Sequence, residues 1–212
     1  MKKTRLISVL LLVFLFLLIP LSVQAASNIA ILTVFSDPTK SYVGSSGLKY
    51  DVGTHSWITV KNIASTSITV GALNGIAPGK TVSVGTWSDL VTKEHKGIWY
   101  NLEARYIRED GAYSGRVSRT YYLTATKLDT LNKKIKNNDR WYLIQPCSYW
   151  ACMQWNSVAD SSLSSVFPST PKKLAASIKA TSGWTTRAAV PYDYPVYYAN
   201  GAGTPIRSII YY

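Results

Sequence analysis

The chain contains few of the residues that carry thiol, imidazole and metal chemistry. It has two cysteines, Cys147 and Cys152, and two histidines, His55 and His95. No Cys-x-x-Cys pair occurs, and a zinc site needs three or four suitably spaced ligands, so neither a metal nor another cofactor is expected. A phosphate-binding glycine loop and a Gly-x-Ser-x-Gly elbow are also missing, which leaves few pairings of a nucleophile with a base.

Residues 1–25 have the organisation of a secretory signal peptide. Its parts are a basic start at Lys2, Lys3 and Arg5, an apolar run over residues 6–21, and small residues near a cleavage point at Val23-Gln24-Ala25. The apolar run is long for a signal, so a retained transmembrane anchor is the alternative. The small residues and the polar chain that follows favour cleavage. With no lipobox cysteine or C-terminal sorting signal, we expect a secreted protein without a stable membrane anchor.

Acidic residues are scarce, because 11 Asp and Glu accompany 23 Lys and Arg, for a net charge of +12. Cleavage after residue 25 removes three basic residues and leaves about +9. No run of Lys or Arg exceeds two residues, so the pattern favours a soluble basic surface without a dedicated polyanion site. Nucleic acid is not an expected partner. An anionic cell-wall polymer or peptidoglycan is a candidate partner, and the protein is expected to be a bacterial, cell-wall-associated monomer.

The two cysteines lie five positions apart in a helix-like stretch. Five residues of helix rise about 7.5 Å, whereas a disulfide needs Cα atoms within about 7 Å of each other. A bridge between Cys147 and Cys152 would break the helix, so both are expected to be free thiols. A free thiol in an exported protein is a liability unless it is buried or used. Cys152 lies inside the helix and is expected to be buried, whereas Cys147 lies at the helix start and is expected to be the thiol that is used.

The first half of the chain is rich in strand patterns and the second half in helix patterns. Strands are predicted over Asn28–Phe35, His55–Val60, Ser67–Ala72, Thr81–Trp87, Ile98–Ile107 and Arg116–Leu123, with a loop over 36–54 and a hairpin turn at Asp110-Gly111. A further short strand is predicted over 141–144. No internal repeat appears. Residues 26–184 are therefore predicted to form one α+β domain, and residues 185–212 an extended C-terminal tail.

Three helices are predicted after residue 124. The first starts at an N-cap, Thr126, and places Leu128, Leu131 and Ile135 on one face. The second starts at Cys147 and carries Ala151, Trp155 and Val158 on one face, and the third starts at Thr170-Pro171. The Cys147 helix is apolar on most sides. We therefore expect an antiparallel sheet packed against a buried helix that bears the cysteine.

A thiol at a helix N-terminus beside an imidazole on a strand is suited to nucleophilic catalysis. The helix dipole and the free N–H groups favour the thiolate, and the imidazole accepts the thiol proton. A lone cysteine on an apolar helix is, however, more often a core residue. Cys147, at the start of its helix, and His55, which opens a strand, are the candidates. His95 is a rival base, but the polar run Thr92–Lys96 indicates a solvated turn.

The order of the two residues adds a family resemblance. His55-Ser56-Trp57-Ile58 opens a strand and Cys147-Ser148-Tyr149-Trp150-Ala151 opens a buried helix later in the chain. This arrangement resembles the circularly permuted, lecithin–retinol acyltransferase-like branch of the papain-like NlpC superfamily, over about half of the chain. The resemblance implies a permuted papain-like fold in residues 26–184, a Cys147 nucleophile and a His55 base. It also implies a third polar residue, on the strand after the His55 strand, that orients the imidazole.

The third position is open among Asn101, Glu103 and His95. Asn101 and Glu103 share one face of the predicted strand, and an amide or a carboxylate is a normal partner of imidazole. We assign the role to Asn101. Pro146, directly before the cysteine, has no N–H group. The candidate hydrogen-bond donors to an oxyanion are therefore the Cys147 N–H group and the Gln145 side chain.

The function expected from these features is a secreted thiol hydrolase, a cysteine peptidase or amidase that cleaves an amide bond in cell-wall peptide. A lipid acyl hydrolase or transferase is a variant, because the permuted branch includes lipid enzymes. The alternative class is a non-catalytic secreted binding domain for wall glycan or peptide. Its support is the aromatic content of 7 Trp and 15 Tyr, which could line a groove. A secreted toxin fits the charge and the signal, but no motif supports it.

Overall fold

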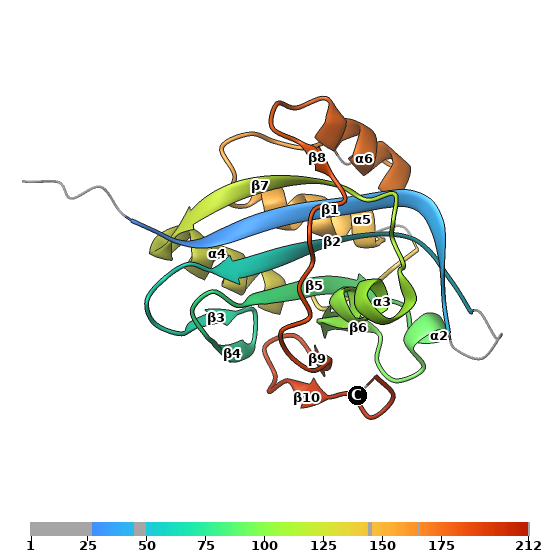
Figure 1. Cartoon of the computed structure of the whole chain (residues 1–212), viewed down its shortest axis with the longest axis horizontal. Helices are drawn as coiled ribbons and strands as arrows, with labels where there is room; N and C mark the ends of the chain where they lie inside the picture. Colours follow the sequence, from blue (N-terminus) through green and yellow to red (C-terminus); the bar gives the residue numbers. More distant parts are fainter. Residues whose placement is uncertain (1–26, 45–49, 144–145, 165, 212) are drawn as a thin grey trace, which may run out of the picture.

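The computed structural model describes residues 27–44, 50–143, 146–164 and 166–211. Within them the chain forms an eight-stranded sheet with helices on both faces (Figure 1). Every described strand pairing is antiparallel, which confirms the predicted α+β class with an antiparallel sheet. The predicted signal peptide lies outside the described residues. Among the described helices, none has the length and apolarity needed to cross a membrane.

The elements are as follows. In spatial order the sheet contains β10 (Ile206–Arg207), β9 (Tyr197–Ala199), β6 (Gly97–Tyr100), β5 (Thr81–Trp87), β2 (Tyr50–Asn62), β1 (Asn28–Val43), β7 (Val117–Thr124) and β8 (Thr185–Thr186). A separate two-stranded sheet contains β3 (Ile68–Val70) and β4 (Leu73–Ile76). The helices are α2 (Asp89–Thr92), α3 (Leu102–Asp110), α4 (Ala125–Lys136), α5 (Cys147–Asn156) and α6 (Pro171–Lys179).

The loop predicted over residues 36–54 is largely wrong, because β1 continues to Val43 and β2 starts at Tyr50. Polar residues continue the pairing: Ser36 lies opposite Ser56, and Asp37 lies opposite His55. The two serine Oγ atoms are 2.7 Å apart in the interior. The register shifts just after Asp37, where Pro38 has no N–H group to donate. Because the paired residues here are polar although they are buried, a search for alternating hydrophobic residues does not detect this part of the hairpin.

The strand predicted over 98–107 is correct only as far as Tyr100, and the hairpin predicted at 110–111 is wrong. Strand β6 ends at Tyr100, and Asn101 takes a left-handed conformation with φ 64° that turns the chain into α3. Asparagine tolerates this conformation better than most residues. Gly111 is the left-handed C-cap of α3, with φ 64°, rather than a hairpin residue. The buried Leu102 and Tyr106 lie four positions apart and so share one face of a helix.

The three helices of the second half are confirmed, with one change at a boundary. Helix α4 is capped by Thr124, whose side chain accepts a bond from the Lys127 N–H group, and not by Thr126. Helix α6 has the expected N-cap at Thr170 and proline at its first position. The strand predicted over 141–144 falls partly outside the described residues, and Tyr142 forms only a single bridge.

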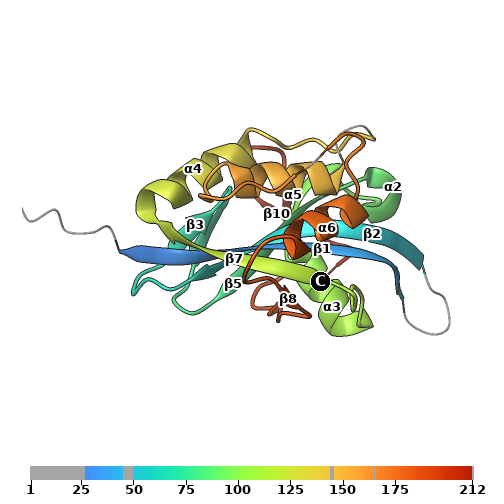
Figure 2. The ribbon, with the colours of Figure 1, turned by 90° about the horizontal axis from the view of Figure 1, so that it is seen from above.

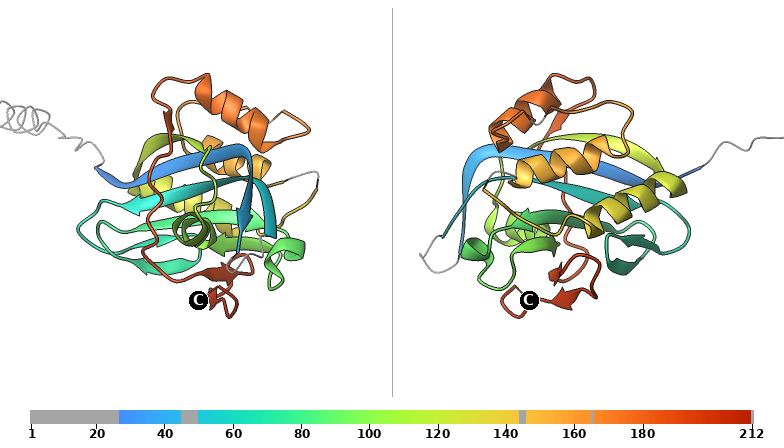
Figure 3. Two further views of the ribbon diagram at one scale, coloured as in Figure 1. Left: turned by 45° about the vertical axis from the view of Figure 1, so that its right-hand side comes forward. Right: turned by 180° about the vertical axis from the view of Figure 1, so that it is seen from behind.

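The helices divide between the two faces of the sheet. Figure 2 shows α4 and α5 on one face and α3 on the other, and Figure 3 shows α4 and α5 crossing the sheet from behind. The α5 face buries aliphatic strand residues, including Leu32, Ile58 and Val84, whereas the α3 face is aromatic. Both faces of the central strands are therefore covered, and β5 is buried along its whole length.

The C-terminal segment joins both edges of the sheet. Strand β8 pairs with β7 at one edge, and β9 pairs with β6 at the other. The chain between them crosses the α3 face (Figure 1). Hydrogen bonds fix the crossing, including those from the Thr81 N–H group to Asp193 and from the Asn101 amide to the Pro195 carbonyl. This crossing strap supports the turn that leads into α3.

Candidate active site

Cys147 is the first residue of α5 and is buried, with 6% of its surface exposed. The N-cap is Pro146, which makes no capping bond through its side chain. The helix packs against β2, β1 and β5. Neither cysteine forms a disulfide bond, as expected. The first N–H groups of an uncapped helix carry partial positive charge and point toward a group placed at the helix start, as Cys147 is.

His55 lies on β2 with its ring on the aromatic face of the sheet. The ring centroid is 4.0 Å from that of Trp87, 5.8 Å from that of Trp57 and 5.7 Å from that of Tyr113. The side chain is 3% exposed. Three aromatic neighbours exclude water from the imidazole and restrict its rotation, so its orientation is set by the fold.

The sheet opens at this point. Pairing between β2 and β5 runs from Ile58 and Val84 to Lys61 and Thr81, and it stops before either strand reaches the level of His55. Beyond Ile58, β2 pairs only with β1, and β5 pairs with β6. His55 therefore lies where two neighbouring strands separate. This explains how an imidazole on the α3 face interacts with a thiol at the end of α5, on the opposite face.

Glu103, in the first turn of α3, is the hydrogen-bonded partner of the imidazole. Its Oε1 atom lies 3.0 Å from His55 Nε2 and accepts a 2.8 Å bond from Trp87 Nε1. Its Oε2 atom accepts a 2.8 Å bond from Ser83 Oγ. The carboxylate is fully buried and is bonded through both oxygens. Since Nε2 faces Glu103, Nδ1 is the ring nitrogen left for the thiol of Cys147.

Burial alone would lower the pKa of His55, because it disfavours the charged imidazolium. The charge of Cys147 and its side-chain hydrogen bond act in the opposite sense, and so do the hydrogen bond and the charge of Glu103. Together they raise the pKa of His55 to about 9. The imidazole therefore holds its proton at neutral pH. A protonated imidazole beside a cysteine thiolate is the ion pair that thiol catalysis requires.

The assignment of Asn101 as the imidazole partner is corrected by this geometry. Its side-chain oxygen accepts a 3.2 Å bond from the Ser83 N–H group, and its amide nitrogen donates to Pro195. The Asn101 N–H group also donates to the Ser83 carbonyl at 2.8 Å. Because the chain turns at Asn101 and does not continue as a strand, Glu103 points back over β5 to His55. Asn101 thus fixes the turn that positions Glu103.

His95 does not join this cluster. Its Nε2 atom lies 3.5 Å from Asp139 Oδ1, and its ring stacks on Tyr198 at 4.9 Å. Asp139 also accepts bonds from the N–H groups of Ile98 and Gly201. The side chain of His95 is only 17% exposed, so it is a packed residue that ties a loop to β6 and β9, rather than part of a solvated turn.

Sequence reasoning missed the residues of β5 that complete the site. Ser83, Gly85 and Trp87 alternate along the strand and so share the face that carries Glu103 and His55. The alternation was present in the predicted strand 81–87. Without the pairing of β5 with β2, however, nothing connected that face to the histidine.

Tyr113 adds a hydrogen-bond donor to the site. Its hydroxyl is buried, with no hydrogen-bond partner among the described residues. Burial, followed by the charges of Glu103, Tyr106 and Cys147, raises the pKa of Tyr113 well above its usual value. The phenol therefore stays protonated near the thiol. Gln145, the side-chain oxyanion donor considered from the sequence, lies outside the described residues.

Comparisons with known proteins supply no function for this chain. Within the described ranges, no group of three or more Cys, His, Asp or Glu residues is placed to hold a metal ion. The site is therefore described by its thiol, imidazole, carboxylate and phenol. Compared with models of protein families, with curated proteins and with solved structures, the sequence and its fold gave no match.

Proposed function

We propose that this chain is an exported thiol hydrolase of the permuted papain-like group that cleaves an amide bond in cell-wall peptides. The observation that carries the proposal is the Cys147–His55–Glu103 cluster, in which a helix-terminal thiol and a buried carboxylate both act on one imidazole. A histidine that only filled the core would need a hydrogen-bond partner such as Glu103, but not a thiol at the start of a helix. The order of the residues along the chain, with His55 before Cys147, supports the permuted arrangement.

The cluster supports a two-step reaction. The Cys147 thiolate attacks the amide carbonyl, and the His55 imidazolium gives its proton to the leaving amine, so that an acyl-enzyme forms. Neutral His55 then takes a proton from water, whose oxygen attacks the thioester and releases the acid and the thiol. Glu103 stabilises the imidazolium throughout. The N–H groups at the start of α5 and the Tyr113 hydroxyl are the donors available to the oxyanion.

The cell wall as substrate is supported by the predicted signal peptide and by the basic charge of the chain. Incubation of purified cell wall with the protein is expected to expose new amino groups, and the Cys147→Ser variant is expected to expose none. Iodoacetamide should modify Cys147 at a pH well below 8.5, the ordinary pKa of a free thiol, and this reaction should slow in His55→Ala. An inert Cys147, unaffected by His55→Ala, would favour a non-catalytic binding domain.

Tyr113→Phe tests the role of the phenol. Because the hydroxyl has no partner among the described residues, its removal should leave the free energy of unfolding within about 0.5 kcal/mol of wild type. If the hydroxyl donates to the oxyanion, turnover should fall about tenfold, the effect of one hydrogen bond. Thermal unfolding and amide cleavage measured in parallel check this. Unchanged turnover would remove Tyr113 from the mechanism.

An ester of a long acyl chain is the second candidate substrate. Three exposed apolar residues lie near the start of α5. Leu143, which is 85% exposed, is near in sequence, and Val166 and Phe167, which are 64% and 73% exposed, are near in space. The bond between Ser148 and Ser169 brings the 166–169 segment to this helix. To distinguish acyl-ester from amide cleavage, the same preparation is incubated with phospholipid vesicles and with cell wall. The identity of the released product then decides between the two activities.

A further inference from the structure

A groove with a volume of about 990 Å³ lies between α2, α3, the β1–β2 hairpin and the C-terminal residues. Its apolar lining includes Val43, Val52, Leu90, Val91 and Tyr106. Leu90 is 77% exposed although it faces a hollow. The volume lies within the range of sites that hold small ligands. The groove is therefore large enough for several residues of a peptide.

The groove shares a wall with the catalytic cluster. Tyr106 lines the groove and packs edge-on against Trp87, with ring centroids 5.7 Å apart. Trp87 in turn lies 4.0 Å from the His55 ring and donates to Glu103. One aromatic side chain therefore separates a groove residue from the imidazole. A ligand in the groove would lie on the α3 side of the sheet, with Tyr106 and Trp87 between it and the His55 ring.

The carboxylates that line the groove already have partners. Asp51 pairs with Lys40 at 3.5 Å, Glu109 pairs with Arg108 at 3.2 Å, and Asp110 accepts a 2.9 Å bond from the Gly44 N–H group. These contacts reduce their availability to a ligand. Each carboxylate of the lining therefore has a hydrogen bond or an ion pair within the protein, but it keeps its negative charge.

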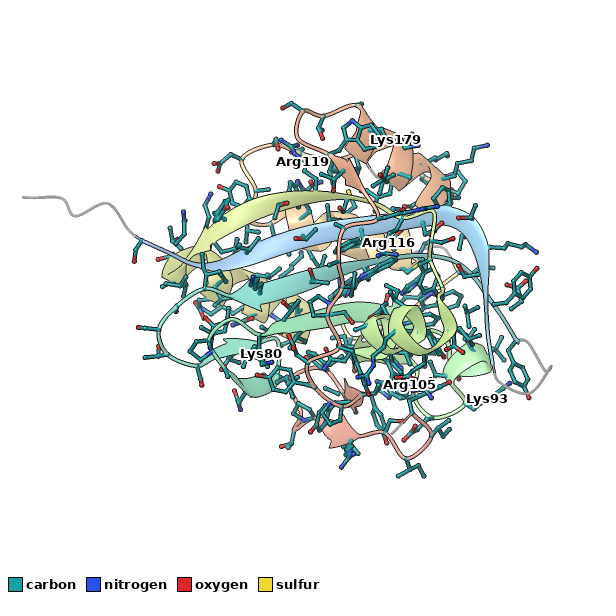
Figure 4. All side chains as sticks on the ribbon, viewed as in Figure 1. Lys80, Lys93, Arg105, Arg116, Arg119 and Lys179 are labelled. Atoms are coloured by element: carbon teal, nitrogen blue, oxygen red, sulfur yellow. The ribbon has the colours of Figure 1, made fainter. Side chains whose placement is uncertain are left out.

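Unlike the acidic residues, the two basic residues of the groove lining have no oppositely charged partner among the described residues. Among the described residues, Lys93 has no acidic partner, and Arg105 has only the ring of Tyr211, 5.5 Å from its Cζ atom. Figure 4 labels both side chains, Lys93 beside α2 and Arg105 beside α3. The groove therefore combines an apolar lining with two cationic groups that are not paired with carboxylates.

We propose that this groove binds the peptide part of the substrate, an apolar segment that carries a carboxylate attracted to Lys93 and Arg105. The inference rests on the proposed function and extends it to the substrate class. A bilayer of anionic lipid would require a wide surface of one sign, and here Asp51, Glu109 and Asp110 interrupt the positive charge. A discrete carboxylate beside apolar side chains fits both parts of the lining.

The test measures binding and cleavage separately. A synthetic peptidoglycan stem peptide with free carboxylates, and the same peptide with amidated carboxylates, are titrated calorimetrically into the Cys147→Ala chain. We expect the free-carboxylate peptide to bind about tenfold more tightly than the amidated one, and Lys93→Glu and Arg105→Gln to remove most of that preference. Lys96→Glu is the matched control, because Lys96 lies three residues from Lys93 and lines a different hollow. It should change affinity less than twofold.

Each outcome bears on the groove or on the enzyme. Equal losses in Lys93→Glu and Lys96→Glu would overturn the groove as the site and indicate a general effect of charge. Equal affinity for the two peptides, no binding of either, or binding only to phosphatidylglycerol vesicles would also overturn it. Binding with the expected preference, but no cleavage by the wild-type chain, would support the groove and contradict the hydrolase. Cleavage of the peptide with no effect of Lys93→Glu would support the hydrolase and contradict the groove as the binding site.

Discussion

Replacing Glu103 with alanine is expected to slow turnover by a factor on the order of 10²–10⁴, the range found for groups that support proton transfer. The substitution removes the acceptor of His55 Nε2, so the imidazole loses both its orientation and the charge that stabilises its protonated form. It also leaves Trp87 Nε1 and Ser83 Oγ buried without an acceptor. Stability should therefore fall by about 3 kcal/mol. Turnover and urea unfolding measured on one preparation check both effects.

Glu103→Gln separates charge from geometry. An amide can still accept from Trp87 and meet Ser83, so the fold should tolerate it, but it carries no negative charge. Because the Glu103 charge helps raise the pKa of His55, the variant should lower that pKa. The ratio of Cys147 alkylation by iodoacetate to that by iodoacetamide reports the imidazolium, since only the anionic reagent is attracted to it. In wild type this ratio should fall as the pH passes about 9, and in Glu103→Gln at a lower pH.

The same pKa predicts how stability depends on pH. A raised pKa in the folded state means that the folded chain binds the proton more tightly than the unfolded one. The stability that His55 contributes is therefore complete below about pH 6.5 and is lost as the pH rises through about 9. His95→Gln is the control variant and should keep the pH dependence of wild type, because His95 lies outside the cluster, beside Asp139.

For the alkylation experiment, an unchanged ratio in Glu103→Gln would show that Glu103 does not act on the imidazole.

The candidate pair could be identified from the sequence because Cys147 starts a helix and His55 lies in a strand-like pattern, although β2 itself starts five residues earlier, at Tyr50. Cys147 follows a proline and opens an apolar helix, and His55 lies in an alternating strand; both patterns are local. The helices after residue 124 were equally accessible, since capping residues and heptad-like spacing are local signals. The antiparallel sheet followed from the strand-rich first half of the chain.

The third residue could not be identified in the same way. The alternation of Ile98, Tyr100, Leu102 and Ala104 predicts a continuous strand, and only the left-handed turn at Asn101 changes it into a helix. That turn is held by Ser83, a residue 18 positions away in the sequence. The partner of His55 therefore depends on a non-local contact, which a pattern of neighbouring residues does not contain.

Gly85→Ala is expected to affect the same interaction from the opposite side. A Cβ atom at this position would overlap Glu103 Oε1 and lie 3.1 Å from His55 Nε2. The carboxylate and the imidazole must then move apart, since β5 is paired with β6 at Gly85 and is buried along its length. We expect a loss of about 1–3 kcal/mol in stability, as in other overpacked interiors. Turnover should fall nearly as far as in Glu103→Ala.

Two further variants separate this effect from simple destabilisation. Gly75→Ala meets no neighbouring atom but has a φ of +76°, so it should cost about 1–2 kcal/mol through backbone strain alone and leave turnover unchanged. Glu103→Asp withdraws the carboxylate by one methylene and makes room for the added Cβ atom. The double variant Gly85→Ala with Glu103→Asp should therefore be more stable and more active than Gly85→Ala alone. Additive losses in that double-mutant cycle would mean that Gly85 and Glu103 act independently, contrary to a close approach that only glycine permits.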